Sequence, residues 1–230
     1  MTLVPLYSST TSLVNASQHV RVLGVHFSSD LSLDKHVSSV SAICFYHLRQ
    51  LRRIRCSLDS DSASKLLHAF VTSRVDYCNA ILTGAPKTTT DMLQRVLIAA
   101  AHVISDTKKF DQGLSRLMHQ ELHWLDIPER VKYKLGMLTH WCLLGKASVY
   151  LSNCCIPVAQ VATRRHLGST ARHQLTVPRH HLSTFRRQAF AVAGPTMFNA
   201  LPDDLWDPAV SITTFRQSMN THLFSAYHHI

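Results

Sequence analysis

The spacing of apolar residues along the chain predicts two kinds of structure. Residues 20–27 form a short apolar strand around Leu23-Gly24, and residues 3–7 are a candidate partner for it. From residue 34 onward the apolar residues recur at the 3.6-residue spacing of helices that bury one face. The pattern therefore predicts a mainly α protein with a short N-terminal β-hairpin.

Four helices are expected in the first two thirds of the chain. Asp59 supplies N-cap chemistry for the second helix, and Gly84 and Pro86 end it. Pro128 suits the first turn of the fourth helix. The expected ranges are 34–53, 61–83, from Thr90-Asp91 to about 105, and from 128 to about 145.

Beyond Pro157 the helical pattern weakens. Residues 158–182 are polar and basic, which indicates a loop with a short strand at 174–177. Two short helices are expected over 187–200 and 213–226. The expected divisions are a β-like start over 1–31, a helical domain over 32–150, and a basic, partly irregular C-terminal region over 151–230.

The charge of the chain is unevenly placed. The net charge is +10, and no Asp or Glu occurs from Arg130 through Pro202, a stretch that holds ten Lys and Arg residues. A field of one sign favours a polyanion partner, because binding releases counterions from the nucleic acid. The alternative is a basic, solubilising surface without a partner, and the asymmetry favours nucleic acid.

The composition is that of a globular protein, with 46% hydrophobic residues. Its longest apolar run, residues 96–101, is far shorter than the roughly 20 residues that a membrane span needs. The N-terminus shows no basic segment followed by an apolar core, so we expect no signal peptide and no secretion. The six cysteines are scattered along the chain, and we expect them to be reduced. Reduced cysteines predict an intracellular protein, nuclear or cytoplasmic.

Asp203-Asp204 is the feature that most resembles a metal site. Polymerases hold two metal ions with such a pair, but that site needs a further carboxylate on a neighbouring strand. Here the pair follows Pro202 and precedes Leu205, which is typical of the start of a helix. We therefore expect no catalytic residue, no metal site and no cofactor in this chain.

Other candidate chemistry is weaker. The chain has no Cys-x-x-Cys pair, and His119 and His123 lack matching cysteines at zinc-finger spacing. Trp124 and Trp141 fit either platforms for nucleic-acid bases or core residues, and their place in apolar helical patterns favours the core.

Residues 66–82 resemble a segment that follows the catalytic domain of LINE-type (non-LTR) retrotransposon reverse transcriptases. The likeness lies in Phe70-Val71-Thr72-Ser73-Arg74 followed by Asp76-Tyr77-Cys78-Asn79. Further stretches are similar to the same family in the same order: 20–27, 93–96, 99–101, 122–125, 189–195, 199–202, 211–215 and 222–224. The chain departs from the family at Leu97-Ile98, His102, Asp126 and Met197-Phe198.

This resemblance implies the end of the palm over 1–31, a helical thumb over 32–150 and the post-thumb region after it. In the intact enzyme it implies RNA-templated DNA synthesis with Mg²⁺. The palm strand with the catalytic Asp-Asp pair is expected upstream of Val20, so we expect no enzyme activity from this chain. The implied partners are RNA and DNA, as template and primer, and no membrane.

The implied nucleic-acid contacts fall in three groups. Leu23 and Gly24 match the motif that helps to place the primer end. The candidate phosphate contacts are Arg49, Arg52, Arg53 and Arg55, together with Arg164, Arg165, Arg172, Arg179, Arg186 and Arg187. The basic residues at the end of the helix over 34–53 equally suit the helix dipole. Two other readings stay open, a helical protein-interaction module and a non-functional relic of a mobile element.

Overall fold

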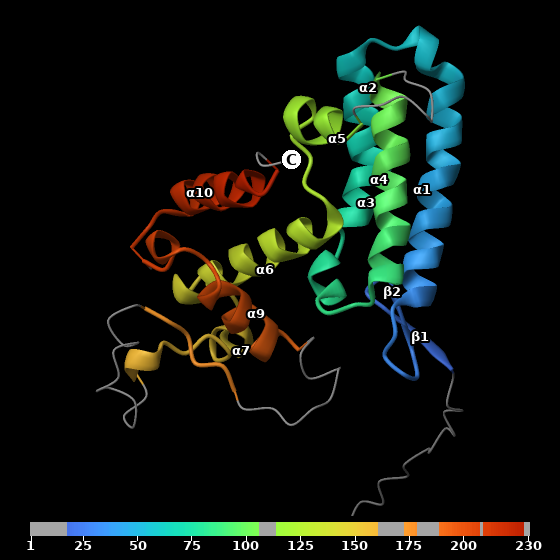
Figure 1. The fold of residues 1–230 in the computed structure, drawn as a ribbon. Helices are drawn as coiled ribbons and strands as arrows, with labels where there is room; N and C mark the ends of the chain where they lie inside the picture. Colours follow the sequence, from blue (N-terminus) through green and yellow to red (C-terminus); the bar gives the residue numbers. More distant parts are fainter. Residues whose placement is uncertain (1–17, 106–113, 161–172, 179–188, 208, 228–230) are drawn as a thin grey trace, which may run out of the picture.

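The computed structural model describes residues 18–105, 114–160, 173–178, 189–207 and 209–227 (Figure 1). The helices and strands are β1 (His19–Val22), β2 (Val25–Ser28), α1 (Asp34–Ile54), α2 (Ser60–Leu67), α3 (Ser73–Asp76), α4 (Lys87–Ser105), α5 (Leu114–Arg116), α6 (Ile127–Leu143), α7 (Val149–Ser152), α9 (Phe190–Asn199) and α10 (Ile212–Ser225). The predicted fold class, mainly α with an N-terminal β-hairpin, is confirmed. Within these ranges no helix combines the length and the apolar character that a membrane crossing requires.

The hairpin forms inside the segment that was predicted to be one strand. β1 and β2 pair antiparallel, with Val22 opposite Val25. Leu23 and Gly24 are the two turn residues, and both have positive φ angles, 47° and 84°. That conformation is typical of the two-residue turn that matches the twist of a hairpin. The prediction of a single strand over 20–27 was therefore wrong. Its candidate partner, residues 3–7, lies outside the described residues.

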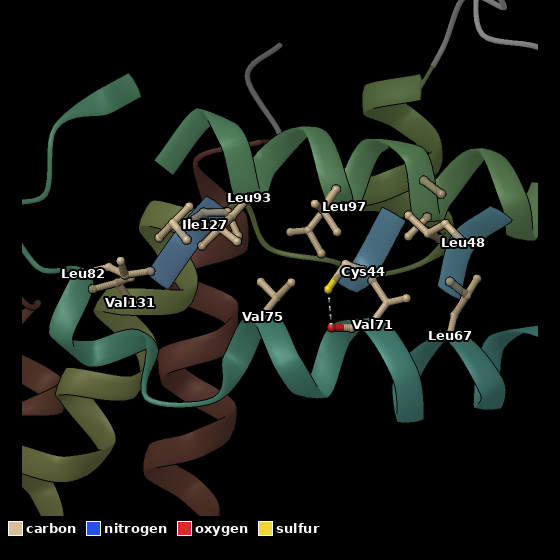
Figure 2. Close-up of a cluster of buried hydrophobic side chains, with 14 of the residues drawn as sticks. Cys44, Leu48, Leu67, Val71, Val75, Leu82, Leu93, Leu97, Ile127 and Val131 are labelled. Carbon is tan, nitrogen blue, oxygen red and sulfur yellow. Dashed lines mark hydrogen bonds between the residues drawn. The ribbon is translucent and has the colours of Figure 1, made fainter. Parts of the chain in front are cut away.

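Three helical segments form a bundle around the larger apolar core. α1, the α2–α3 segment and α4 lie side by side (Figure 1). Figure 2 shows the buried side chains of all three, among them Cys44, Val71 and Leu97, facing one another, with Ile127 and Val131 of α6 at one end. The prediction of a helix over 34–53 is confirmed, because α1 buries Val37, Cys44, Leu48 and Leu51 as the spacing indicated.

The helix predicted over 61–83 is not continuous. The Asp59 side chain does cap α2, accepting from the Ser62 amide at 3.2 Å. A π-helical turn over His68–Thr72 follows, and α3 ends at Asp76. Cys78 then adopts a left-handed conformation (φ 54°), and a 3-10 turn over Asn79–Leu82 carries the chain on. This break reverses the chain so that Leu82 still reaches the core.

α6 joins the bundle to a second apolar core. Pro128 lies in its first turn, as predicted. Its other end packs against α9 and α10, and Gly136 allows their close approach, because a Cβ there would lie 3.0 Å from Met197 Cε and Met219 Cε. This core consists of Leu125, Cys142, Cys155, Leu175, Phe198, Leu201, Leu205, Trp206, Phe215, Met219 and Leu223.

Several finer predictions need correction. The third helix begins at Lys87, directly after Pro86, rather than at Thr90. The strand predicted at 174–177 is a single bridge between Leu175 and Pro157. Trp141 is not a core residue, since 41% of it is exposed on the last turns of α6. Trp124, in contrast, packs against the bundle core as expected.

The two helices predicted near the C-terminus are present as α9 and α10. Asp203-Asp204 begins a 3-10 turn over Asp203–Leu205, directly after Pro202. The pair therefore lies at the start of a helical turn, as the sequence indicated.

Candidate nucleic-acid interface

A basic cleft lies between the hairpin and the bundle. Its volume is about 480 Å³. The hairpin contributes one wall, α1 the floor, and the segment from the π-helical turn to Tyr77 the other wall. We call it the hairpin cleft, and its lining residues are Arg21, Gly24, His26, His36, Ser39, Val40, Ile43, Ala69, Ser73, Arg74 and Tyr77.

The regular periods of strand and helix bring these side chains together. Arg21 and His26 are directly opposite in the hairpin register, so both project from the same face of it. His36, Val40 and Ile43 follow one another at helical spacing on α1. Tyr77 closes the end of the cleft beside Gly24. Its Cε1 lies 3.7 Å from the position that a Cβ would take if Gly24 carried a side chain.

The hydroxyl of Tyr77 anchors the turn of the hairpin. It donates a 2.7 Å hydrogen bond to the carbonyl oxygen of Leu23. Leu23 itself is 84% exposed, so this bond to its backbone carbonyl ties the turn to the bundle. Of the two residues predicted to help to place a primer end, Gly24 lines the cleft, and Leu23 precedes it in the turn.

The hairpin cleft carries uncompensated positive charge. No Asp or Glu is among its lining residues, and no ion pair found in the described ranges involves Arg21 or Arg74. The rings of His26 and His36 lie 6.4 Å apart. Burial, and then the charge of His26, lowers the pKa of His36. The constant charge of the cleft therefore comes from the two guanidinium groups.

His36 also presents an unusual polar atom. The residue is only 8% exposed, and its Nδ1 is buried without a hydrogen-bond partner. Buried polar groups normally find such a partner, because an unsatisfied one costs about 1–3 kcal/mol.

The predicted arginines of α1 are separated from this cleft. Arg49, Arg52 and Arg53 are exposed near the C-terminal end of α1. At about 1.5 Å per residue, Arg53 lies roughly 25 Å along the helix from His36. The structure therefore does not bring this group to Leu23 and Gly24.

The guanidinium group of Arg55 donates hydrogen bonds to backbone carbonyl groups within the protein. Its Nε and Nη2 donate to the carbonyl oxygens of Val103 and Ile104 at 2.9 and 2.7 Å, and its Nη1 donates to that of Leu58 at 2.7 Å. Two of these carbonyls belong to the last turn of α4, where no amide partner remains within the helix. This placement favours a structural role over a phosphate contact.

The other predicted arginines belong to the basic C-terminal region. Arg164, Arg165, Arg172, Arg179, Arg186 and Arg187 lie outside the described residues. In the described ranges, no group of three or more His, Cys, Asp or Glu side chains has the arrangement of a metal site.

Sequence reasoning missed Arg21, His26, His36 and Arg74 as site residues. The signal for Arg21 and His26 is their placement two residues on either side of the turn, which requires that Leu23-Gly24 be recognised as a turn. Arg74 is part of the stretch that resembles reverse transcriptases, but the helical spacing of Arg74 and Tyr77 gives no sign that the hairpin covers them.

A second hollow lies on another side of the molecule. It has a volume of about 1230 Å³ and lies between α4, α6, α9 and α10. Its apolar lining includes Val131, Leu135, Val192 and Leu223, and its charged residues are of both signs. It lacks the one-signed charge of the hairpin cleft.

Comparison with known proteins identifies no family. The chain matches no protein-family model, no curated protein and no solved structure.

Proposed function

We propose that this chain binds nucleic acid through the sugar–phosphate backbone, as the thumb-like part of a LINE-type reverse transcriptase. The observation that carries this proposal is the hairpin cleft, where Arg21 and Arg74 face solvent with no acidic residue in the lining. The proposed ligands are RNA and DNA, as template and primer. The proposal has no catalytic step, and Mg²⁺ belongs only to the intact enzyme that the resemblance implies.

The physical basis is the geometry of guanidinium groups around an accessible cleft. Arginine presents a planar set of donors that matches phosphate oxygens, and it stays charged at all relevant pH values. A strand whose phosphates lie along the cleft passes Arg21 on the hairpin and Arg74 on α3. The Tyr77–Leu23 hydrogen bond connects the two walls. Arg49, Arg52 and Arg53 form a separate group of exposed positive charges near the C-terminal end of α1.

The distribution of charge supports the same proposal. The net charge is +10, and the acid-free stretch from Arg130 through Pro202 adds a further basic region. Phosphate contacts release counterions, so the logarithm of the binding constant falls with the logarithm of salt concentration, by about 0.9 per duplex phosphate or 0.7 per single-strand phosphate.

The deciding experiment is a salt titration of binding. Arg21→Gln combined with Arg74→Gln removes both arginine charges of the cleft. Fluorescence anisotropy with a labelled oligonucleotide measures the slope of the logarithm of the binding constant against the logarithm of salt concentration. We expect a shallower slope, by about 0.7–0.9 for each phosphate that the variant no longer binds. The matched control is Arg95→Gln combined with Arg216→Gln, which removes the same charge from exposed positions on α4 and α10. Equal slopes for the two double variants would overturn the proposed site.

The absence of activity is a separate part of the proposal. The purified chain, incubated with Mg²⁺, deoxynucleotides and a primed RNA, is expected to extend no primer. Sustained nucleotide incorporation would contradict it.

The second candidate function is a helical protein-interaction module. The hollow of about 1230 Å³ between α4, α6, α9 and α10 favours it, because a large hollow with a mainly apolar lining and a few polar groups is typical of binding sites. On this alternative, nucleic-acid binding is weak and insensitive to the Arg21 and Arg74 changes. A non-functional relic is the third reading, and cooperative thermal unfolding of the purified chain would count against it.

A further inference from the structure

An aromatic surface continues the hairpin cleft along the bundle. The rings of His47 and Phe70 are stacked, with centroids 5.2 Å apart and planes at 26°. Tyr46 packs edge-on against His47 at 5.4 Å. Tyr46 and Phe70 remain 53% and 41% exposed. We call these three residues the aromatic shelf.

The shelf is adjacent to the floor of the cleft and to one of its walls. His47 lies four residues after Ile43 on α1, which is about one helical turn, or 5.4 Å. Phe70 directly follows Ala69, another lining residue, and belongs to the π-helical turn over His68–Thr72. A strand that leaves the cleft beside Ile43 and Ala69 therefore passes over the shelf.

We infer that the aromatic shelf stacks unpaired bases, so that the strand held by the hairpin cleft is single-stranded where it crosses α1. This inference rests on the proposed nucleic-acid binding and names the class of ligand. Proteins that hold single strands combine a positively charged groove with exposed aromatic rings. Arg21 and Arg74 supply the first feature and the shelf supplies the second.

Stacking on the aromatic shelf favours a single strand over a duplex as the ligand. Every base has a π-face, but in a duplex both faces are already covered by neighbouring base pairs. A duplex can therefore use only the phosphate contacts of the cleft, whereas an unpaired strand adds contacts with the shelf. Stacking of one base on an aromatic side chain contributes about ten-fold in affinity, in the lower part of the known range.

The test compares three labelled probes of equal length and charge by fluorescence anisotropy. They are a single-stranded DNA of mixed sequence, the same strand with abasic sites, and a hairpin duplex with an equal number of phosphates. We expect the base-bearing single strand to bind the wild-type chain about ten-fold more tightly than the abasic strand. The duplex is expected to resemble the abasic strand.

Variants locate the effect on the shelf. Phe70→Leu should lower affinity for the base-bearing strand about ten-fold and leave the abasic strand unchanged. The control is Phe45→Leu, which makes the same change at a residue of α1 that is 37% exposed but has no part in the shelf. Circular dichroism checks that both variants fold.

The outcomes separate the two proposals. If the wild-type chain binds none of the probes, the proposed nucleic-acid function fails. If it binds all three equally and Phe70→Leu changes nothing, the cleft stands as a phosphate site and the stacking inference is overturned. Equal losses from Phe70→Leu and Phe45→Leu would also overturn it.

Discussion

The hydroxyl of Tyr77 and the carbonyl oxygen of Leu23 are hydrogen-bonded at 2.7 Å, although 54 residues of chain separate them. Tyr77 follows the last residue of α3, and Leu23 is the first turn residue of the hairpin. The hairpin has only two strands, and such a unit is marginally stable when isolated. Its position on the bundle therefore depends on this bond and on the packing of Val25 and Phe27 against the core.

Replacement of Tyr77 by Phe removes the bond and keeps the ring. Because Tyr77 is 52% exposed, we expect only a small loss in the free energy of unfolding. Amide hydrogen exchange should rise selectively in residues 19–28, since the hairpin opens without unfolding of the bundle. Tyr150→Phe, at a residue 72% exposed on α7, is the control. Unchanged exchange in the hairpin would show that apolar packing alone holds it.

Arg130 connects α6 to the end of α3. Its Nη1 lies 2.8 and 3.1 Å from the two carboxylate oxygens of Asp76, and its Nε donates to the Leu125 carbonyl oxygen at 2.7 Å. The side chains of Arg130 and Asp76 are 12% and 38% exposed, so solvent screens the pair only in part. A double-mutant cycle with Arg130→Ala and Asp76→Ala should give a coupling energy of about 1–2 kcal/mol.

The matched control for this cycle is the pair of Lys65 and Asp61. Its 2.6 Å separation is shorter, but both side chains are at least 70% exposed. A much smaller coupling energy is expected there, as for surface pairs one helical turn apart. Equal coupling in the two cycles would show that burial adds nothing to the Arg130 pair.

The amphipathic helices could be predicted because each carries its own signal. The spacing of Val37, Cys44, Leu48 and Leu51 is enough to define one face of α1, whatever covers that face. Proline in the first turn of α6 is a local signal of the same kind. Elements of this type depend on residues that are close in sequence.

The points where a strand or helix is interrupted could not be predicted in the same way. Leucine at position 23 and cysteine at position 78 adopt left-handed conformations that residues of these types rarely take. No local motif marks them, since the usual turn signals are Asn-Gly or Asp-Gly. The position of the hairpin turn and the end of α3 therefore escaped prediction for one reason, which is that tertiary packing overrides local preference.

The candidate site shows the same limit. Leu23 and Gly24 were named from the resemblance, and Gly24 does line a cleft. The cleft itself depends on the contact between Leu23 and Tyr77, which sequence spacing does not reveal. The position of Arg55 in the sequence likewise does not reveal that its guanidinium group donates hydrogen bonds to three carbonyl oxygens.

Two buried histidines predict loss of stability in acid. His140 is fully buried, stacks on Phe215 at 4.1 Å, and donates from Nε2 to the Val210 carbonyl oxygen at 3.1 Å. Burial lowers the pKa of both His36 and His140 below the ordinary value of 6.5. The unfolded chain therefore binds protons first as the pH falls. Stability should decrease from about 6.5 downward until the lowered pKa of each folded histidine is passed.

Denaturant unfolding at a series of pH values measures this effect. His140→Gln retains a donor for Val210 but does not titrate, so its free energy of unfolding should change less with pH than that of the wild type. Its stability at neutral pH should also be lower, because the stack on Phe215 is lost. An identical pH dependence in both proteins would show that His140 does not contribute.

The cysteines should differ in their reactivity. Burial raises the pKa of Cys44 to about 11 and that of Cys155 to about 12, and it also raises the pKa of Cys142. The reactive form is the thiolate, so these three should resist alkylation in the folded protein. Exposed Cys56 should be modified first. Peptide mass mapping after brief treatment with iodoacetamide, before and after unfolding, checks the order.

Arg52 and Arg55 are three residues apart, yet opposite effects are expected when each is replaced by Gln. Arg55→Gln removes hydrogen bonds from the carbonyl groups of Val103 and Ile104, which should lower the free energy of unfolding by about 1–2 kcal/mol. Arg52→Gln removes an exposed side chain and should change it by less than about 0.5 kcal/mol. Nucleic-acid affinity should fall with Arg52→Gln and stay unchanged for the folded Arg55→Gln protein. Denaturant unfolding and anisotropy on the same samples measure both quantities, and a loss of affinity confined to Arg55→Gln would reverse the assignment of these two arginines.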